Sequence, residues 1–220
     1  MRAIFRFLAA CFAAYLLAVV ALSFIYQFIP PATPLMVASA LRGDGMKREW
    51  VPLSRISPAV VRSVIVSEDA RFCEHDGIDW KAVDRVVQKA ARQGRATAGA
   101  STITMQVTKN LFLFNTRSFL RKAVEAPLAL WLDAVMPKRR ILEIYLNMAE
   151  WGEGRFGIEA AARHEFGVGA GQLSAQQAAL LVTMLPAPKD RSAGNPGPKH
   201  AAMAATVAAR APRANTSCLR

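Results

Sequence analysis

The sequence describes a basic protein of 220 residues, in which 28 lysines and arginines face 16 aspartates and glutamates for a formal net charge of +12. Such a charge favours an anionic partner, and by itself does not choose among nucleic acid, anionic lipid and a phosphorylated substrate. None of the 3 cysteines has a C-x-x-C partner, so their spacing does not support a zinc site. Cys11 lies in an apolar run, whereas Cys73 and Cys218 can form a disulfide if the domain lies outside the cytoplasm.

The N-terminal segment Phe7–Ile29 is almost wholly apolar. A helix of that length reaches roughly 34 Å, enough to cross a bilayer core of about 30 Å. Arg2 and Arg6 precede it, which predicts a cytoplasmic N-terminus. A cleaved signal peptide with an A-x-A site at 38–40 and a buried core helix are the alternatives. Because the apolar region is long and the A-x-A site lies well beyond its end, we expect a retained anchor.

The rest of the chain divides into three further parts. After residues 1–30, which hold the cytoplasmic N-terminus and the anchor, residues 31–57 are broken by prolines and glycines and are expected to be a linker and entry segment. Residues 58–190 show a helical period with few strand patterns, and 191–220 form a basic C-terminal helix or tail. The expected helices are 58–73, 79–93, 101–112, 117–135, 138–149, 156–166, 174–185 and 197–211.

The stretch Ser67–Gly77 carries the strongest chemical signal. It contains four carboxylates and a histidine, and it directly follows the apolar run Val60–Val66. The pair Glu68 and Asp69 is therefore expected where a buried helix meets a cleft. A carboxylate that is partly desolvated there has a raised pKa and can accept a proton near neutral pH. The alternative is a polar helix end that carries only surface charges.

A second stretch, Gly94–Asn110, leads from small residues into a helix. Ser101 is the expected N-cap, and the free N–H groups at that helix start favour an anion. Thr102, Gln106 and Lys109 share one helix face, which suits sugar hydroxyls and a phosphate. The alternative is an ordinary capped helix with a polar outer face.

A third stretch, Arg117–Glu125, concentrates basic residues around one carboxylate. Its functional interpretation is a cationic wall for a diphosphate, with Glu125 alongside. The alternative is a ladder of ion pairs one helical turn apart, each contributing only a few tenths of a kcal/mol.

Five short motifs, in order, resemble those of the peptidoglycan glycosyltransferases, glycosyltransferase family 51. The motifs are Glu68-Asp69-x-x-Phe72-x-x-His75-x-Gly77, Gly99-x-Ser101-Thr102-Ile103-x-x-Gln106-x-x-Lys109-Asn110, Arg121-Lys122-x-x-Glu125, Arg140-Ile141-Leu142-Glu143-x-Tyr145-Leu146-Asn147 and Gly157-x-x-Ala160-Ala161-x-x-x-x-Phe166-Gly167. The resemblance covers about residues 50 to 190 and points to the monofunctional, membrane-anchored form. Ala100, Met105 and Glu165 depart from the usual pattern, and none of them replaces a residue that the family uses for chemistry.

The resemblance implies a mainly α architecture: a transmembrane helix followed by a lysozyme-like helical domain with a small membrane-associated jaw. It implies polymerisation of lipid II into β-1,4-linked glycan strands, with inversion and release of undecaprenyl diphosphate. Glu68 and Glu125 would be the catalytic residues, with Glu68 as base and Glu125 beside the leaving diphosphate. The residues expected to bind substrate are Asp69, Ser101, Thr102, Gln106, Lys109, Asn110, Arg117 and Lys122.

The same resemblance carries expectations about ligands and surroundings. No cofactor is obligatory, although a divalent cation, Mg or Mn, can be held at Glu125. The expected partners are lipid II, the lipid-linked glycan strand, the membrane and cell-wall proteins of division or elongation, and not nucleic acid. The chain would be a single-pass protein of the bacterial inner membrane with a periplasmic catalytic domain. His75 is expected on the cleft wall, and Tyr145 and Asn147 in the core or supporting the ligands.

Two other functions remain open at this point. A lytic transglycosylase or muramidase has a similar fold and a glutamate, but it cleaves glycan and needs no site for a lipid diphosphate. The cations around Glu125 argue against it. An inactive scaffold of the cell-wall machinery would require neither Glu68 nor Glu125.

Overall fold

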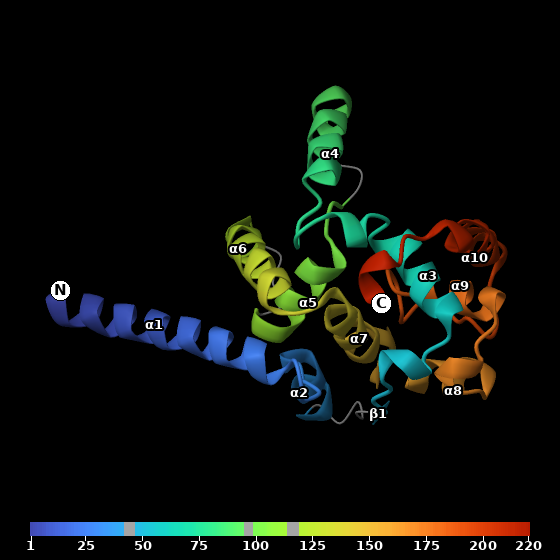
Figure 1. Ribbon diagram of the computed structural model, residues 1–220, viewed down its shortest axis with the longest axis horizontal. Coiled ribbons are helices and arrows are strands. Elements are labelled where there is room, and N and C mark those ends of the chain that lie inside the picture. The colour runs from blue at the N-terminus through green and yellow to red at the C-terminus, as the bar shows by residue number, and fades with distance from the viewer. Residues whose placement is uncertain (42–46, 95–98, 114–118) are drawn as a thin grey trace.

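The structure is a computed structural model that describes residues 1–41, 47–94, 99–113 and 119–220. Helices dominate these residues, so the predicted mainly α class is confirmed (Figure 1). The helices are α1 (Arg2–Ile25), α2 (Pro34–Leu41), α3 (Pro58–Glu68), α4 (Trp80–Gln93), α5 (Ile103–Phe112), α6 (Phe119–Val135), α7 (Lys138–Met148), α8 (Ile158–Phe166), α9 (Ala175–Val182) and α10 (Pro198–Arg210). Three short strands, β1 (Lys47–Arg48), β2 (Glu150–Gly152) and β3 (Arg155–Phe156), form a small sheet in the order β1-β3-β2.

The main hydrophobic core is formed by α3, α5, α7, α8 and α9, with side chains from α6 and α10. Helix α3 packs against both α9 and α10, and α7 is buried along most of its length. Asn147 on α7 ties the entry segment to this core, because its side chain accepts from the Val51 N–H at 2.8 Å and donates to the Val51 carbonyl at 2.9 Å. The core thus supports the C-terminal end of α3, where the first motif begins.

A second and smaller apolar cluster lies between α4, α5 and α6. Ile78, Met105 and Ala129 are buried in it, and Val83 and Ala126 pack against them. Helix α4 has no buried residue and projects from the body (Figure 1). We call α4, α5 and α6 the smaller lobe; α5 and α6 also contribute side chains to the main core. The membrane-associated jaw stays a prediction.

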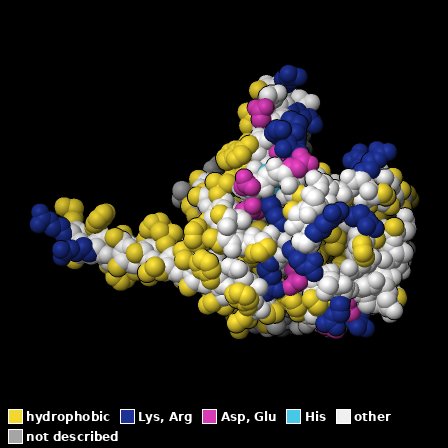
Figure 2. All heavy atoms as spheres, in the orientation of Figure 1, with side chains coloured by type: hydrophobic (Ala, Val, Ile, Leu, Met, Phe, Trp, Pro, Cys, Tyr) yellow, Lys and Arg dark blue, Asp and Glu magenta, His cyan; other side chains and the backbone are white. Residues whose placement is uncertain are grey.

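Helix α1 extends away from the domain and is the one described helix that is long and apolar enough to cross a membrane (Figure 1). On the face shown in Figure 2, its surface is hydrophobic and its basic side chains gather at the far end. Its C-terminal half touches the smaller lobe: Tyr15 donates to the Phe112 carbonyl at 3.2 Å, and the indole N–H of Trp131 donates to Ser23 Oγ at 3.3 Å. The anchor is therefore packed on α5 and α6.

Two expected boundaries were wrong. The linker contains a helix, α2, because Pro34 occupies its first turn, where a missing N–H costs nothing, and Thr33 Oγ1 accepts from the Met36 N–H at 3.2 Å. The helix expected over 58–73 ends at Glu68, and a 3₁₀ turn, Phe72–Glu74, follows. The backbone of Asp69 leaves the helical region (φ −159°, ψ 74°), and its carboxylate bonds elsewhere, as described below.

The C-terminal segment is attached to the first motif by a disulfide. Cys73, in the 3₁₀ turn after α3, pairs with Cys218 at a Cα–Cα distance of 5.3 Å. Leu219 is buried, and its carbonyl accepts from Arg139 at 3.1 Å. The pairing that the sequence left open is therefore present, and it closes a loop that spans almost the whole domain.

Loss of this bond should destabilise the domain. We expect Cys218→Ser to lower the free energy of unfolding by about 2–5 kcal/mol, because the unfolded chain regains the entropy that the long loop had removed. Calorimetry of the oxidised protein measures the change, and Cys11→Ser is the control because Cys11 is free and exposed on α1. Equal melting temperatures for Cys218→Ser and the wild type would contradict this expectation.

Candidate functional site

Glu68 is the last residue of α3 and lines a cavity of about 190 Å³ together with Asp69, Arg71, Asp79, Arg85 and the segment 99–102. Gln106 donates to Glu68 Oε2 at 3.1 Å. Burial raises the pKa of Glu68, the Gln106 amide and the neighbouring Tyr145 hydroxyl oppose the rise, and the negative charge of Asp69 adds to it. Glu68 is therefore a half-buried carboxylate at a cavity, as predicted, and it is suited to accept a proton.

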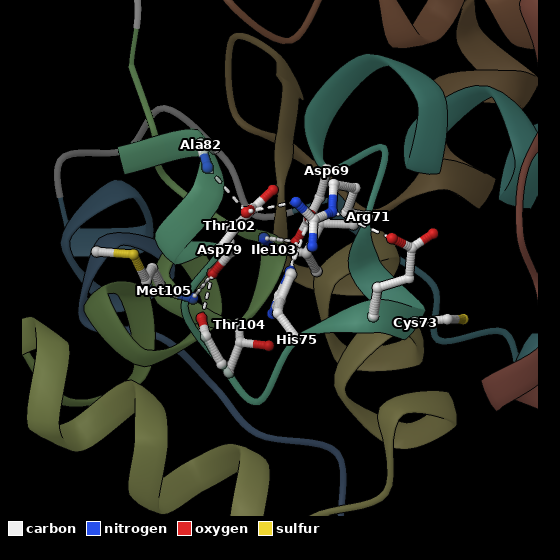
Figure 3. A network of polar contacts seen from close by, with 12 residues as sticks. Asp69, Arg71, Cys73, His75, Asp79, Ala82, Thr102, Ile103, Thr104 and Met105 are labelled. Atoms are coloured by element: carbon white, nitrogen blue, oxygen red, sulfur yellow. Dashed lines mark hydrogen bonds and ion pairs between the residues drawn. The ribbon is translucent and has the colours of Figure 1, made fainter. Parts of the chain in front are cut away.

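Asp69 joins three elements of the site (Figure 3). Its carboxylate oxygens lie 3.0 and 3.1 Å from His75 Nε2, and Oδ2 accepts the Ile103 N–H at 3.0 Å. The end of α3, the 3₁₀ turn and the start of α5 therefore meet at one buried carboxylate. His75 is not among the residues that line the cavity, so its place on the cleft wall stays a prediction, as does a direct contact of Asp69 with substrate.

The start of α5 corrects one detail of the sequence interpretation. Thr102, and not Ser101, is the N-cap: its Oγ1 accepts the Met105 N–H at 3.0 Å and donates to the Gly77 carbonyl at 2.6 Å (Figure 3). Ser101 precedes the cap and lines the cavity. Gly77 is required at this contact because it has φ +87° and a Cβ there would lie 2.6 Å from the Ala129 carbonyl oxygen.

The charged cluster consists of Lys109 on α5 and of Arg121, Lys122 and Glu125 on α6. Glu125 is 2% exposed and forms a close ion pair with Arg121. Burial lowers the pKa of Lys109, the negative charge of Glu125 opposes this, and the positive charges of Arg121 and Lys122 lower it further. These four groups are thus near enough to interact, and Lys122 is exposed.

The remaining predicted residues are less informative. Asn110 follows Lys109 near the end of α5 and is half-buried, while Arg117 lies outside the described residues. Arg121 is absent from the predicted site residues, although its spacing from Glu125 was the available signal. Tyr145, expected in the core or supporting the ligands, is a core residue of α7 and is 2% exposed.

The site also limits where a divalent cation could bind. Among the described residues, no three His, Cys, Asp or Glu side chains gather as a ready set of metal ligands. Glu125 offers one carboxylate, which already accepts from Arg121. Because Mg²⁺ is commonly held by one or two carboxylates together with substrate phosphates, Glu125 fits such an ion only in company with a diphosphate.

These features define an enzyme class. A helical domain that follows a long apolar helix holds a carboxylate of raised pKa at a cavity, and helices α5 and α6 carry a cluster of cations. Such a site can take a proton from a hydroxyl and stabilise an anionic leaving group.

Comparison with known proteins agrees with this class. Residues 36–211 match the family model described as transglycosylase. A biosynthetic peptidoglycan transglycosylase of Rhizobium meliloti is 53% identical over 190 residues, which are 86% of this chain and 80% of that protein. Proteins of the same description from Agrobacterium fabrum (55% over 170 residues, 77% and 75% covered) and Nitrobacter hamburgensis (50% over 198 residues, 89% and 87% covered) are also similar. The chain therefore belongs to the transglycosylase family.

Proposed function

We propose that this protein polymerises lipid II into β-1,4-linked glycan strands. Its family membership and its relatives make it a peptidoglycan glycosyltransferase. The observation that best supports the finer proposal is the position of Glu68, a base beside a cavity, in a domain whose neighbouring helices α5 and α6 carry the cations of the charged cluster. A polymer of lipid-linked sugars requires both parts, because each addition moves one proton and releases one diphosphate.

The reaction is a single displacement at the anomeric carbon of the donor. Glu68 takes the proton from the 4-hydroxyl of the acceptor while that oxygen forms the new glycosidic bond. The bond from the anomeric carbon to the phosphate oxygen breaks, and undecaprenyl diphosphate leaves. Attack from the opposite face converts the α-linked donor into a β-linked product.

The charged cluster would stabilise the leaving diphosphate. Lys109 and Lys122 supply positive charge, and the ion pair with the buried Glu125 orients the half-buried guanidinium of Arg121. Groups that are oriented before negative charge develops favour the transition state more than the ground state. A divalent cation bound at Glu125 and the diphosphate would add to this neutralisation.

Helix α1 supports a placement of the protein in the membrane. Tyr15 bonds to the end of α5, and it lies about ten residues before Ile25, or roughly 15 Å along the helix. If α1 spans the bilayer, the apolar end of α5 enters the outer leaflet, and the charged cluster comes near the headgroups, where a lipid diphosphate resides. A disulfide persists in oxidising compartments, so Cys73–Cys218 supports a periplasmic domain and a cytoplasmic N-terminus.

The base can be tested by a conservative exchange. We expect Glu68→Gln to fold normally and to lose polymerisation of lipid II by more than about a hundredfold, since an amide cannot accept the proton. Glu74→Gln is the control, because it makes the same exchange at an exposed carboxylate. Glu74 lies in the 3₁₀ turn after α3 and pairs with Arg71. Activity of the Glu68→Gln enzyme within about tenfold of the wild type would show that another group is the base.

The cations can be tested at an exposed member of the cluster. Lys122→Ala should leave the melting temperature nearly unchanged and reduce kcat about a hundredfold, because charge on the leaving diphosphate is no longer neutralised. Lys89→Ala, at an exposed position on α4, is the control. Preserved turnover of the Lys122→Ala enzyme would remove Lys122 from the site.

The anchor can be tested on protein extracted from membranes. Mass spectrometry should find the intact N-terminal segment, because the apolar helix begins next to Arg2 and is long enough to span the bilayer. A mature chain beginning at Leu41 would show that residues 1–40 are a cleaved signal peptide.

A further inference from the structure

Another cavity, of about 290 Å³, lies where the start of α3 meets the start of α7 and the C-terminal segment. Its charged side chains are Arg62 on α3, Arg139 on α7 and Arg220 in the C-terminal segment, and its described lining includes no aspartate or glutamate. On the face shown in Figure 2, Lys and Arg side chains gather over the region where α3 and the C-terminus lie in Figure 1. We call this site the arginine cavity; it shares no residue with the cavity at Glu68.

Two of the three guanidiniums are not used by the fold. Arg139 donates to the Leu219 carbonyl at 3.1 Å, which holds the C-terminal segment as one wall of the cavity. Arg62 is half-buried and Arg220 is exposed, and neither forms a hydrogen bond or ion pair with another residue of the described structure. A guanidinium offers five N–H donors in a planar fork that matches a carboxylate. The cavity therefore presents donors that a bound anion can satisfy.

The floor of the arginine cavity is apolar. Leu53, Ile56, Val61 and Leu219 line it; they belong to the main core and are between 4% and 9% exposed. The cavity thus reaches core side chains beneath its charged rim, which a site for a small hydrophilic anion would not require. Its volume is close to the lower limit of about 300 Å³ for small-ligand pockets, so it has room for an apolar side chain and not for the acyl chains of a lipid.

We propose that the arginine cavity docks a short acidic segment of another protein, in which carboxylates flank an apolar side chain. The apolar side chain enters the floor, and the carboxylates pair with the guanidiniums at the rim. Arginine–carboxylate pairs are frequently bidentate, and arginine is enriched at protein interfaces, where charges of opposite sign meet. The proposal does not rest on the proposed function, because the cavity at Glu68 takes no part in it.

The arginine cavity lies on the helix that ends at the functional site. Pro58, Val61 and Arg62 line the cavity from the first turns of α3, and Glu68 is the last residue of the same helix. The wall formed by the C-terminal segment is joined to the turn after α3 by the disulfide of Cys73. A partner held here would therefore be attached to α3 and would leave the cavity at Glu68 open.

Binding of defined peptides to the full-length protein in uncharged detergent tests the proposal. The probe is a fluorescein-labelled hexapeptide that alternates glutamate and leucine, and its binding is followed by fluorescence anisotropy at low ionic strength. It should bind with a Kd below about 1 mM. A peptide that alternates glutamate and serine should bind at least about tenfold more weakly, because it carries the same charge and has no side chain for the apolar floor.

The deciding variant is Arg62→Glu, since Arg62 has no partner that folding requires. It should weaken the binding of the glutamate–leucine peptide by about tenfold or more, because the new carboxylate repels those of the peptide. Arg92→Glu makes the same exchange at an exposed position on α4 and is the control, which should keep the affinity within about twofold. If Arg62→Glu does not fold, Arg220→Glu at the exposed rim gives the same comparison.

Four results would overturn the proposal. The first is no binding of the glutamate–leucine peptide at about 1 mM. The second is equal affinity of the wild type and the Arg62→Glu protein for this peptide. The third is equal affinity of the wild type for the leucine and serine peptides, which would show an electrostatic patch alone. The fourth is displacement of the bound peptide by phosphatidylglycerol in mixed micelles, which would show that the cavity takes lipid headgroups.

Discussion

The geometry of the site depends on the buried carboxylate of Asp69. It binds His75 and the Ile103 N–H at once, and so requires α3 to end one residue earlier, at Glu68. A continued helix would carry Asp69 away from these partners. A buried carboxylate without them would lose several kcal/mol of hydrogen bonding and solvation, so the chain turns where the carboxylate can be satisfied. The placement of Glu68 at the cavity follows from this turn.

Two hydrophobic clusters of different size hold the helices of the site in place. The large core supports α3 and α7 from behind, while the small cluster of Ile78, Met105 and Ala129 holds α4, α5 and α6 on the other side. The disulfide between Cys73 and Cys218 attaches the last residues of the chain to the turn that carries His75. Glu68 at the end of α3 accepts from Gln106 on α5, and helix α1 contacts α5 and α6.

Much of this arrangement could be predicted because it has a local cause. Apolar periodicity predicted the helices, the run before Glu68 predicted a half-buried carboxylate, and the spacing of Arg121 and Glu125 predicted their pair. Other features depend on contacts distant in sequence. The cap at Thr102 depends on the Gly77 carbonyl, and the end of α3 depends on the Ile103 N–H. The sequence pattern does not predict the helix that begins at Pro34, because proline interrupts the interior of a helix and is tolerated only in its first turn.

The central claim is that the site builds glycan and does not cut it. The most direct measurement is to incubate the purified full-length protein with lipid II in detergent, and in parallel with isolated cell wall, and to analyse the products by gel and mass spectrometry. The site described above predicts a ladder of lipid-linked glycan from lipid II and no soluble fragments from the wall. Release of muropeptides from the wall, with lipid II left unchanged, would contradict it.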